Sequence, residues 1–245
     1  MPSFGRLARH YDRLMHNVPY GMWASYYQLL LASIESDPDT LLDVCCGTGT
    51  VAEILHENGY RVAGVDLSAP MIEEARRKAK EKGLDVDYYV ADATSMELGR
   101  KFDGAYSFFD SLNYIASPEG LRDAIARTAA HLNPDGSFIF DLNTEFAFTE
   151  QMFDMKETHP NRKLKYDWSG TYDPETRLIR VRMKFWTKEG EEFTEEHLQR
   201  AHPHEEVIAA LRDAGFRHIS AFDAYTMNPP RTRSDRLHYV AWGLE

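Results

Sequence analysis

The residues best suited to chemistry lie where an apolar segment, Leu41–Cys45, runs into a glycine-containing turn and then into a helical pattern. Gly47 and Gly49 lack a β-carbon, so a ligand can approach the backbone closely and a positive φ costs little. The helix that follows adds unpaired N–H groups at its N-terminus. Asp66, at the end of the next apolar segment, could hydrogen-bond a ribose diol. The pattern predicts a site for an adenosine-containing ligand on a doubly wound sheet.

The position of Asp43 bears on which adenosine compound would fit. A dinucleotide site has the pattern G-x-G-x-x-G, and Ala52 stands here in the place of the third glycine. The carboxylate of Asp43, just before the turn, would repel a pyrophosphate but could orient an ammonium group, directly or through water. The sequence therefore favours a nucleoside with an amino-acid tail over a dinucleotide.

Alternating strands and helices are needed to position these residues, and the hydrophobic pattern predicts them. Two helices, broken near Pro19, are expected within residues 1–35. Alternation of this kind indicates a mostly parallel sheet covered on both faces. Strands are expected at 41–45, 61–66, 86–91, 102–109, 137–142, 216–225 and 237–243, helices at 51–58, 70–82, 119–132 and 205–214, and a turn at 133–136.

Between residues 144 and 202 the hydrophobic pattern changes from alternating strands and helices to successive β-segments. Three of these are expected, at 163–172, 177–188 and 192–202. Arg180–Phe185 alternates strictly between charged and apolar residues, as a half-buried antiparallel strand does. We therefore predict a core made of residues 1–143 and 203–245 and an inserted antiparallel β lid at 144–202.

Composition limits the classes of function. The chain has 245 residues and a formal net charge of −11, which speaks against a general affinity for nucleic acid or for acidic membranes. No apolar run has the length of a membrane span, and the first ten residues lack the apolar core of a signal peptide. The two cysteines are adjacent and are expected to be reduced, which favours a cytoplasmic protein. The ten histidines show no HExxH pattern, so no metal is predicted.

Three segments in order resemble the motifs of class I S-adenosylmethionine (SAM)-dependent methyltransferases. Residues 42–50 resemble the first, usually written D-x-G-C-G-T-G, with Cys45 in the place of its first glycine. Residues 64–68 with Met71 resemble the second, and residues 90–94 the third. The resemblance covers about residues 40–143 and 203–243. It implies a Rossmann-like, seven-stranded α/β sheet, SAM as cofactor and S-adenosylhomocysteine as product.

The same resemblance implies roles for individual residues. Asp66 would hold the ribose hydroxyls, Leu67 and Met71 would pack on the adenine, and Asp92 with the Ala93 backbone would read the adenine edge. Residues 108–114 would leave the fourth strand beside the reacting methyl group. The residues predicted to bind the cofactor are Tyr11, Tyr20, Trp23, Asp43, Cys45, Gly47, Gly49, Asp66, Leu67, Met71, Asp92, Ala93 and Phe109.

A narrower resemblance involves Tyr11–Met15, Tyr20 and Trp23. They resemble the N-terminal lid of a subgroup that includes glycine N-methyltransferase-like and amino-sugar N-methyltransferase enzymes, which also carry an antiparallel insertion. In such enzymes the N-terminal aromatic residues close over the cofactor. The resemblance implies a small-molecule acceptor methylated at nitrogen, with no membrane partner. A monomer and a homodimer both remain open.

An amine acceptor must be neutral to react, so a base is useful. His197 and Tyr114 are the predicted catalytic residues, and His202 and Tyr166 are further candidates for the base. Arg200 could hold a substrate carboxylate through a two-pronged contact. The residues predicted to bind substrate are Asp110, Asn113, Tyr166 and Arg200, the first two because they lie at the end of a predicted parallel strand.

Three other functions remain open from the sequence. A tRNA-modifying methyltransferase could use a basic patch of Arg231, Arg233 and Arg236 with the strand around Arg180, although the net charge opposes it. An NAD(P)-dependent oxidoreductase would use the same strand–turn–helix unit. A non-catalytic SAM-binding protein would share the whole cofactor site.

Overall fold

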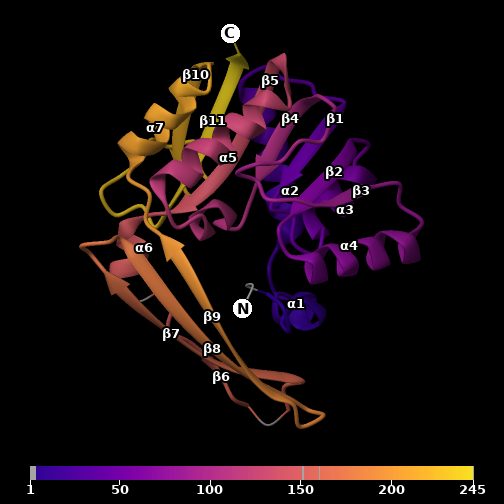
Figure 1. The fold of residues 1–245 in the computed structure, drawn as a ribbon, viewed down its shortest axis with the longest axis vertical. Coiled ribbons are helices and arrows are strands. Elements are labelled where there is room, and N and C mark those ends of the chain that lie inside the picture. The colour runs from indigo at the N-terminus through magenta and orange to yellow at the C-terminus, as the bar shows by residue number, and fades with distance from the viewer. Residues whose placement is uncertain (1–3, 151, 160, 245) are drawn as a thin grey trace.

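The computed structural model describes residues 4–150, 152–159 and 161–244, and it contains two β-sheets (Figure 1). A 7-stranded sheet has the order β10-β11-β5-β4-β1-β2-β3, and a 4-stranded sheet has the order β6-β7-β8-β9. The strands are β1 (Thr40–Val44), β2 (Arg61–Asp66), β3 (Asp87–Val90), β4 (Phe102–Ser107), β5 (Leu132–Asn143), β6 (Met155–Glu157), β7 (Leu164–Asp173), β8 (Leu178–Thr187), β9 (Glu192–Arg200), β10 (Phe216–Asp223) and β11 (Arg236–Leu244). The helices are α1 (Ala8–Leu14), α2 (Tyr20–Ser33), α3 (Thr50–Glu57), α4 (Ala69–Lys82), the 3-10 helix η1 (Ser111–Tyr114), α5 (Pro118–Ala130), α6 (Glu145–Thr149) and α7 (His204–Asp213).

The larger sheet confirms the predicted doubly wound α/β architecture. Strand β1 pairs in parallel with β2 on one side and with β4 on the other. Strand β11 runs antiparallel to both of its neighbours, β5 and β10. The connections from β1 and from β4 leave in opposite directions across the sheet, so a crevice forms outside the carboxyl ends of these strands. Ligands of open α/β sheets bind at this point.

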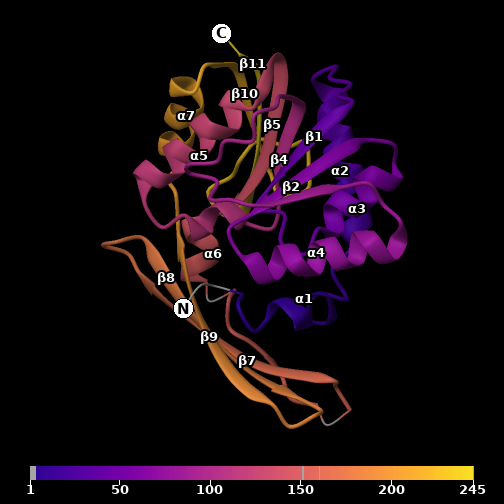
Figure 2. The same ribbon diagram turned by 45° about the vertical axis from the view of Figure 1, so that its right-hand side comes forward.

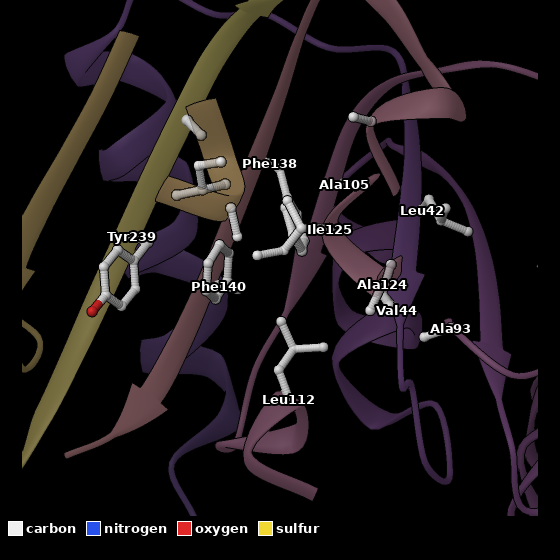
Figure 3. Packing of buried hydrophobic residues seen from close by; sticks show 14 of the residues in the cluster. Leu42, Val44, Ala93, Ala105, Leu112, Ala124, Ile125, Phe138, Phe140 and Tyr239 are labelled. Atoms are coloured by element: carbon white, nitrogen blue, oxygen red, sulfur yellow. The ribbon is translucent and has the colours of Figure 1, made fainter. Parts of the chain in front are cut away.

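The core lies on both faces of this sheet because successive residues of a strand point to opposite sides. Leu42 of β1 belongs to a cluster covered by α5 and α7, which Figure 3 shows with Phe138, Phe140 and Tyr239. The preceding residue, Leu41, belongs to the opposite cluster, which is covered by α2, α3 and α4. Strands buried on both faces explain the continuous apolar segments of the sequence.

The turn predicted at residues 133–136 lies inside a strand. β5 already begins at Leu132, which pairs with Phe102 of β4, and the pairing resumes at Ser137 opposite Gly104. The three extra residues on β5 form a bulge that carries the Pro134-Asp135-Gly136 sequence. Turn-forming residues therefore mark an irregularity within the strand here and not its boundary. The helix predicted to reach residue 132 ends at Ala130 for the same reason.

The smaller sheet contains the three predicted antiparallel segments as β7, β8 and β9. In β8 the side chains of Val181, Met183 and Phe185 are buried, whereas Arg180 and Arg182 are exposed. The buried face packs with α6 and with Leu7 from the N-terminal segment. The short strand β6 and the helix α6 were not predicted. The division of the chain into two domains at residues 144 and 202 stays a prediction.

Both predicted N-terminal helices are present, and they lie in different places. Helix α2 packs on the larger sheet with α3. Helix α1 lies away from that sheet, beside α4 and the smaller sheet (Figure 2). Residues 1–3 of the predicted helical segment lie outside the described part of the chain. Within that part, a helix with the length and apolar character needed to cross a bilayer is absent.

Asp103 joins the beginnings of β1 and β4 and gives a stability prediction that depends on pH. Its carboxylate accepts hydrogen bonds from Thr40 N at 2.9 Å, Thr40 Oγ1 at 2.7 Å and Asn133 Nδ2 at 2.7 Å. Although burial raises it, these hydrogen bonds hold the pKa of Asp103 below its usual range. A lowered folded-state pKa stabilises the protein above the unfolded-state value of about 4, and this contribution is lost as the pH falls through the folded-state pKa.

We therefore expect Asp103→Asn to reduce the free energy of unfolding at pH 7 by about 1 kcal/mol or less, because the site is partly screened by solvent. The difference from the wild type should shrink as the pH is lowered below about 4. Urea unfolding at a series of pH values measures both effects. Asp135→Asn, at an exposed position of the same bulge, is the matched control. A deficit that stays constant down to pH 3 would contradict this account.

Candidate active site

A cavity of about 540 Å³ lies at the carboxyl ends of β1, β2 and β4, in the crevice that the topology predicts. The N-terminal segment and strands β7, β8 and β9 supply its opposite walls. Its size is within the range of small-molecule sites. Fourteen of the predicted site residues line it: Tyr11, Tyr20, Asp43, Cys45, Gly47, Asp66, Leu67, Met71, Asp92, Ala93, Phe109, Asp110, Tyr114 and His197.

The glycine turn after β1 has the predicted backbone conformation. Cys45, Gly47 and Gly49 have φ angles of 63°, 55° and 76°. Such angles favour glycine, and the non-glycine Cys45 adopts one at the position where the family motif has a glycine. A β-carbon on Gly47 would meet no atom within 4 Å, so the space beside it is open. The space beside Gly49 is filled instead, because a β-carbon there would overlap the Tyr88 side chain.

Three carboxyl groups surround this turn. Asp43 is buried at the end of β1, and burial raises its pKa well above the usual range. Asp66 accepts hydrogen bonds from Gly47 N at 2.9 Å and Ser68 N at 2.8 Å, so it fixes the turn from the neighbouring strand. Asp92 accepts from Thr94 N at 2.8 Å. A buried carboxyl group with a raised pKa gains stability from a bound cation.

The N-terminal segment is held over the cavity at two points. At one end, the Glu195 carboxylate accepts hydrogen bonds from the backbone N–H groups of Phe4, Arg6 and Leu7, at 2.9, 3.0 and 2.9 Å. At the other end, Asp12 of α1 accepts from Thr48 Oγ1 at 2.5 Å and lies 2.7 Å from Lys78 Nζ. Between these points, Tyr11 lines the cavity.

Aromatic residues of α2 form a second wall. Tyr20 lines the cavity, and its ring centroid lies 5.1 Å from that of Phe109. Trp23 does not line the cavity. It stacks on the far side of this wall, with its ring centroid 3.7 Å from that of Phe109, and the Arg236 guanidinium lies 5.8 Å from the Trp23 ring. Trp23 therefore supports Phe109 from behind.

A chain of hydrogen bonds links Tyr114, His197 and Glu195. The Tyr114 hydroxyl lies 3.1 Å from His197 Nδ1, and His197 Nε2 lies 3.0 Å from Glu195 Oε2. Because the carboxylate accepts, Nε2 carries the proton and Nδ1 accepts from the Tyr114 hydroxyl. Burial raises the pKa of Tyr114. Burial also raises that of Glu195, but the hydrogen bonds from His197 and from the Leu7 and Phe4 backbone outweigh it and hold that pKa below its usual range.

Arg236 lies between two carboxyl groups at the opposite wall. It forms ion pairs with the buried Asp141 of β5 and, at 2.9 Å, with Asp110 Oδ1. Asp110 Oδ2 accepts a hydrogen bond from Gln199 Nε2 at 2.9 Å, and the Asp110 backbone N–H donates to Asp141 at 2.9 Å. Burial raises the pKa of both Asp110 and Asp141, and the charge of Arg236 opposes this rise.

The remaining predicted residues do not line the cavity. Asn113 is fully buried, and its amide bonds the backbone of Asn143 and Arg200. The Arg200 guanidinium donates to the Thr176 carbonyl at 2.7 Å, and Tyr166 packs beside Trp168. His202 bonds the Ile115 carbonyl, and burial lowers its pKa to about 4. These side chains shape the walls from outside.

Gln199 and Arg236 line the cavity, and Asp141 pairs with Arg236, but none of the three was predicted as a site residue. Gln199 lies beside the predicted residues His197 and Arg200 but was given no role, and Asp141 follows the apolar residues Phe138–Phe140 of β5. Arg236 was expected in a basic surface patch, whereas the structure places it, partly buried, between Asp110 and Asp141. A carboxylate in the middle of an apolar strand, as at Asp141, was the one signal that could have indicated a buried partner.

Comparisons with known proteins agree with this geometry. Residues 41–136 match the family described as "Methyltransferase domain". A protein of Geobacillus sp. (strain WCH70), provisionally named a methyltransferase, is 28% identical and aligns over 98% of this chain and 99% of its own length. A crystal structure of an S-adenosylmethionine-dependent methyltransferase from Clostridium acetobutylicum ATCC 824 superposes with a TM-score of 0.86 at 26% identity, covering 98% of both chains.

A third relative has a named acceptor. It is the dTDP-3-amino-3,4,6-trideoxy-alpha-D-glucopyranose N,N-dimethyltransferase of Streptomyces venezuelae, which is 34% identical over 50% of each chain. The motif segments, the position of the cavity and these similarities agree with one another. Together they support a class I S-adenosylmethionine-dependent methyltransferase with SAM as its cofactor.

Proposed function

We propose that this enzyme transfers the methyl group of SAM to a nitrogen atom of a small-molecule acceptor. The observation that carries the proposal is the chain Tyr114–His197–Glu195, which offers a proton acceptor at the cavity wall. The relative from Streptomyces venezuelae that is named as an amino-sugar N,N-dimethyltransferase supports nitrogen as the acceptor atom.

The residues around the glycine turn fit the cofactor. Open space lies beside Gly47, and the Ser68 hydroxyl is buried without a hydrogen-bond partner in the described part of the chain. We propose that Asp66 holds the ribose hydroxyls, that Leu67 and Met71 contact the adenine, and that Asp43 orients the cofactor's ammonium group. When bound, SAM supplies an electrophilic methyl group for in-line displacement.

The proposed role of the protein side chains is to hold the acceptor and to move one proton. Glu195 keeps the proton of His197 on Nε2, so Nδ1 can accept the proton of the Tyr114 hydroxyl. The Tyr114 oxygen can then take the proton that the acceptor nitrogen loses. The resulting imidazolium would be stabilised by the Glu195 carboxylate. The closed N-terminal segment would exclude water from this site.

A nucleic-acid acceptor is less well supported. Arg236 of the basic patch suggested by the sequence is partly buried and paired with two carboxyl groups, and Arg231 is paired with Asp223. Together with the net charge of −11, these pairings favour a small acceptor in an enclosed cavity. We also propose a cytoplasmic location, since SAM-dependent chemistry with reduced cysteines requires no other compartment.

The direct test of the function is an assay with SAM that carries an isotopically labelled methyl group. We expect the label to appear on nitrogen in a panel of amines, alcohols and phenols, with S-adenosylhomocysteine as the second product. Mass spectrometry of the products identifies the methylated atom. Transfer to oxygen or carbon alone would overturn the assignment to nitrogen. Bulk tRNA added to the same panel tests for methylation of a nucleic acid.

We expect His197→Asn to lower kcat by about 100-fold or more, because a positioned base contributes about 10²–10⁴-fold to a rate. The Kd for S-adenosylhomocysteine should stay within about twofold, since His197 contacts Tyr114 and Glu195 and not the glycine turn. Steady-state kinetics and calorimetry measure the two values. His218→Asn, at an exposed position on β10, serves as the control. An unchanged kcat in the His197 variant would remove the base from the mechanism.

We expect Lys78→Met to weaken cofactor binding, because Lys78 holds Asp12 of α1 and also donates to Thr48 of the glycine turn. The KM for SAM should rise about tenfold with a smaller change in kcat, since the substitution loosens closure but leaves the base intact. Lys80→Met, on the exposed face of the same helix, is the matched control. Asp12→Asn combined with Lys78→Met should have less than the summed effect of the single variants. Additive effects would show that the two residues act independently.

A further inference from the structure

The half of the cavity away from the glycine turn has walls of a distinct chemistry. Apolar side chains from the segment between α6 and β6 and from strands β6, β7 and β8 line it, namely Met152, Phe153, Met155, Trp168, Val181 and Met183. Methionine and aromatic side chains give an adaptable apolar surface that contacts aromatic or aliphatic groups well. A ligand with a substantial apolar body would therefore fit this half.

Two polar atoms of the lining in this region have no partner in the described part of the chain, the Trp168 indole Nε1 and the Gln199 carbonyl oxygen. Gln199 is 2% exposed, and its Nε2 donates to Asp110. Its carbonyl oxygen, Oε1, is buried and makes no hydrogen bond within the described residues. The orientation of the amide is set by the Asp110 carboxyl group, which accepts from the NH₂ end. A buried carbonyl oxygen that lines a cavity lacks the N–H or O–H donor that such groups have almost everywhere in proteins.

The charges around the cavity also select for a donor. Aspartates 43, 66, 92, 110 and 235 line it. Among the described lining residues the permanently charged base is Arg236, and it is already paired with Asp110 and Asp141. His197 is bonded to Glu195. A phosphate or carboxylate on the acceptor would meet no unpaired cation in the described lining, and recognition of such groups relies on unpaired Arg or Lys side chains.

We infer that the acceptor is an amine with an apolar or aromatic body and no anionic group, whose nitrogen donates a hydrogen bond to Gln199 Oε1. This inference rests on the proposed N-methylation and adds the class of substrate to it. Tyr114 and Asp110 line the same part of the cavity as Gln199, so the nitrogen that Gln199 holds is within the region where the base acts.

The test compares an aromatic amine with an aromatic carboxylate of similar shape and with an amine that carries a phosphate in place of the aromatic ring. Protein saturated with S-adenosylhomocysteine is titrated with 2-phenylethylamine, with 3-phenylpropanoate and with O-phosphoethanolamine, and ligand-observed NMR gives each Kd. We expect the phenyl amine to bind at least about tenfold more tightly than either anionic probe. Equal or tighter binding of an anionic probe, or no binding of the phenyl amine, overturns the inference.

Gln199→Met removes the carbonyl oxygen while keeping a side chain of similar length. We expect it to weaken 2-phenylethylamine binding at least about tenfold, with the Kd for S-adenosylhomocysteine within about twofold of the wild type. The unchanged cofactor affinity shows that the variant is folded. Gln28→Met, on α2 and outside the lining, is the matched control. Unchanged amine binding in the Gln199 variant excludes the proposed hydrogen bond.

The two proposals fail in different ways. If labelled methyl reaches the nitrogen of O-phosphoethanolamine as fast as that of 2-phenylethylamine, N-methylation stands and the apolar, non-anionic acceptor is excluded. If 2-phenylethylamine binds as expected but the label reaches only hydroxyl or carbon acceptors, the binding preference stands and N-methylation is excluded.

Discussion

The pairing of one partly buried guanidinium with two carboxyl groups is the constraint on which the substrate half of the cavity depends. Arg236 of β11 bridges Asp141 of β5 and Asp110 at the end of β4. Removing one member would leave an uncompensated buried charge, which costs several kcal/mol in typical proteins. Since Asp110 also fixes the amide of Gln199, the ion pairs determine which end of that amide faces the cavity. The charge and hydrogen-bonding character of the acceptor site follow from this arrangement.

A single carboxylate connects the smaller sheet with the N-terminal segment. Glu195 accepts one hydrogen bond from His197 and three from backbone N–H groups of residues 4–7. Helix α1 contacts α4 and β7, and Tyr11 and Leu14 pack on the apolar cluster of the smaller sheet, so these hydrogen bonds and the pairing of Asp12 with Lys78 add to that packing. The group that orients His197 is therefore also the group that keeps the segment closed.

Much of the fold could be predicted because its signals are local. Two-sided burial gives strands such as β1 and β2 continuous apolar sequences, and alternation in Arg180–Phe185 identifies β8. The glycine turn and Asp66 could be placed for the same reason, since strand, turn and helix are adjacent in the chain. Turn residues at 133–136 misled the prediction because a bulge and a turn favour the same residue types. Strand β6 and helix α6 are too short to show a period.

The rest of the site could not be predicted because it depends on distant partners. Arg236 resembles the surface arginines near it in sequence, and its burial follows from Asp110 and Asp141, which lie far away along the chain. The hydrogen bonds to Glu195 come from backbone N–H groups, which every non-proline residue has, so no residue type marks them. Asn113 and Arg200 illustrate the converse, because residues chosen for their chemistry are used to bond the backbone.

The two attachments of the N-terminal segment have a consequence for how the site opens. One attachment is to Thr48 in the glycine turn and to the adjacent Lys78, and the other is to Glu195 beside His197. Entry of a ligand past α1 requires at least one of them to break. Breaking the first frees the cofactor side of the cavity, and breaking the second removes donors from the carboxylate that orients the base. We infer that Glu195, which orients the base, has its full set of hydrogen bonds only when the segment is closed, and that proton transfer is therefore favoured in a site from which water is excluded.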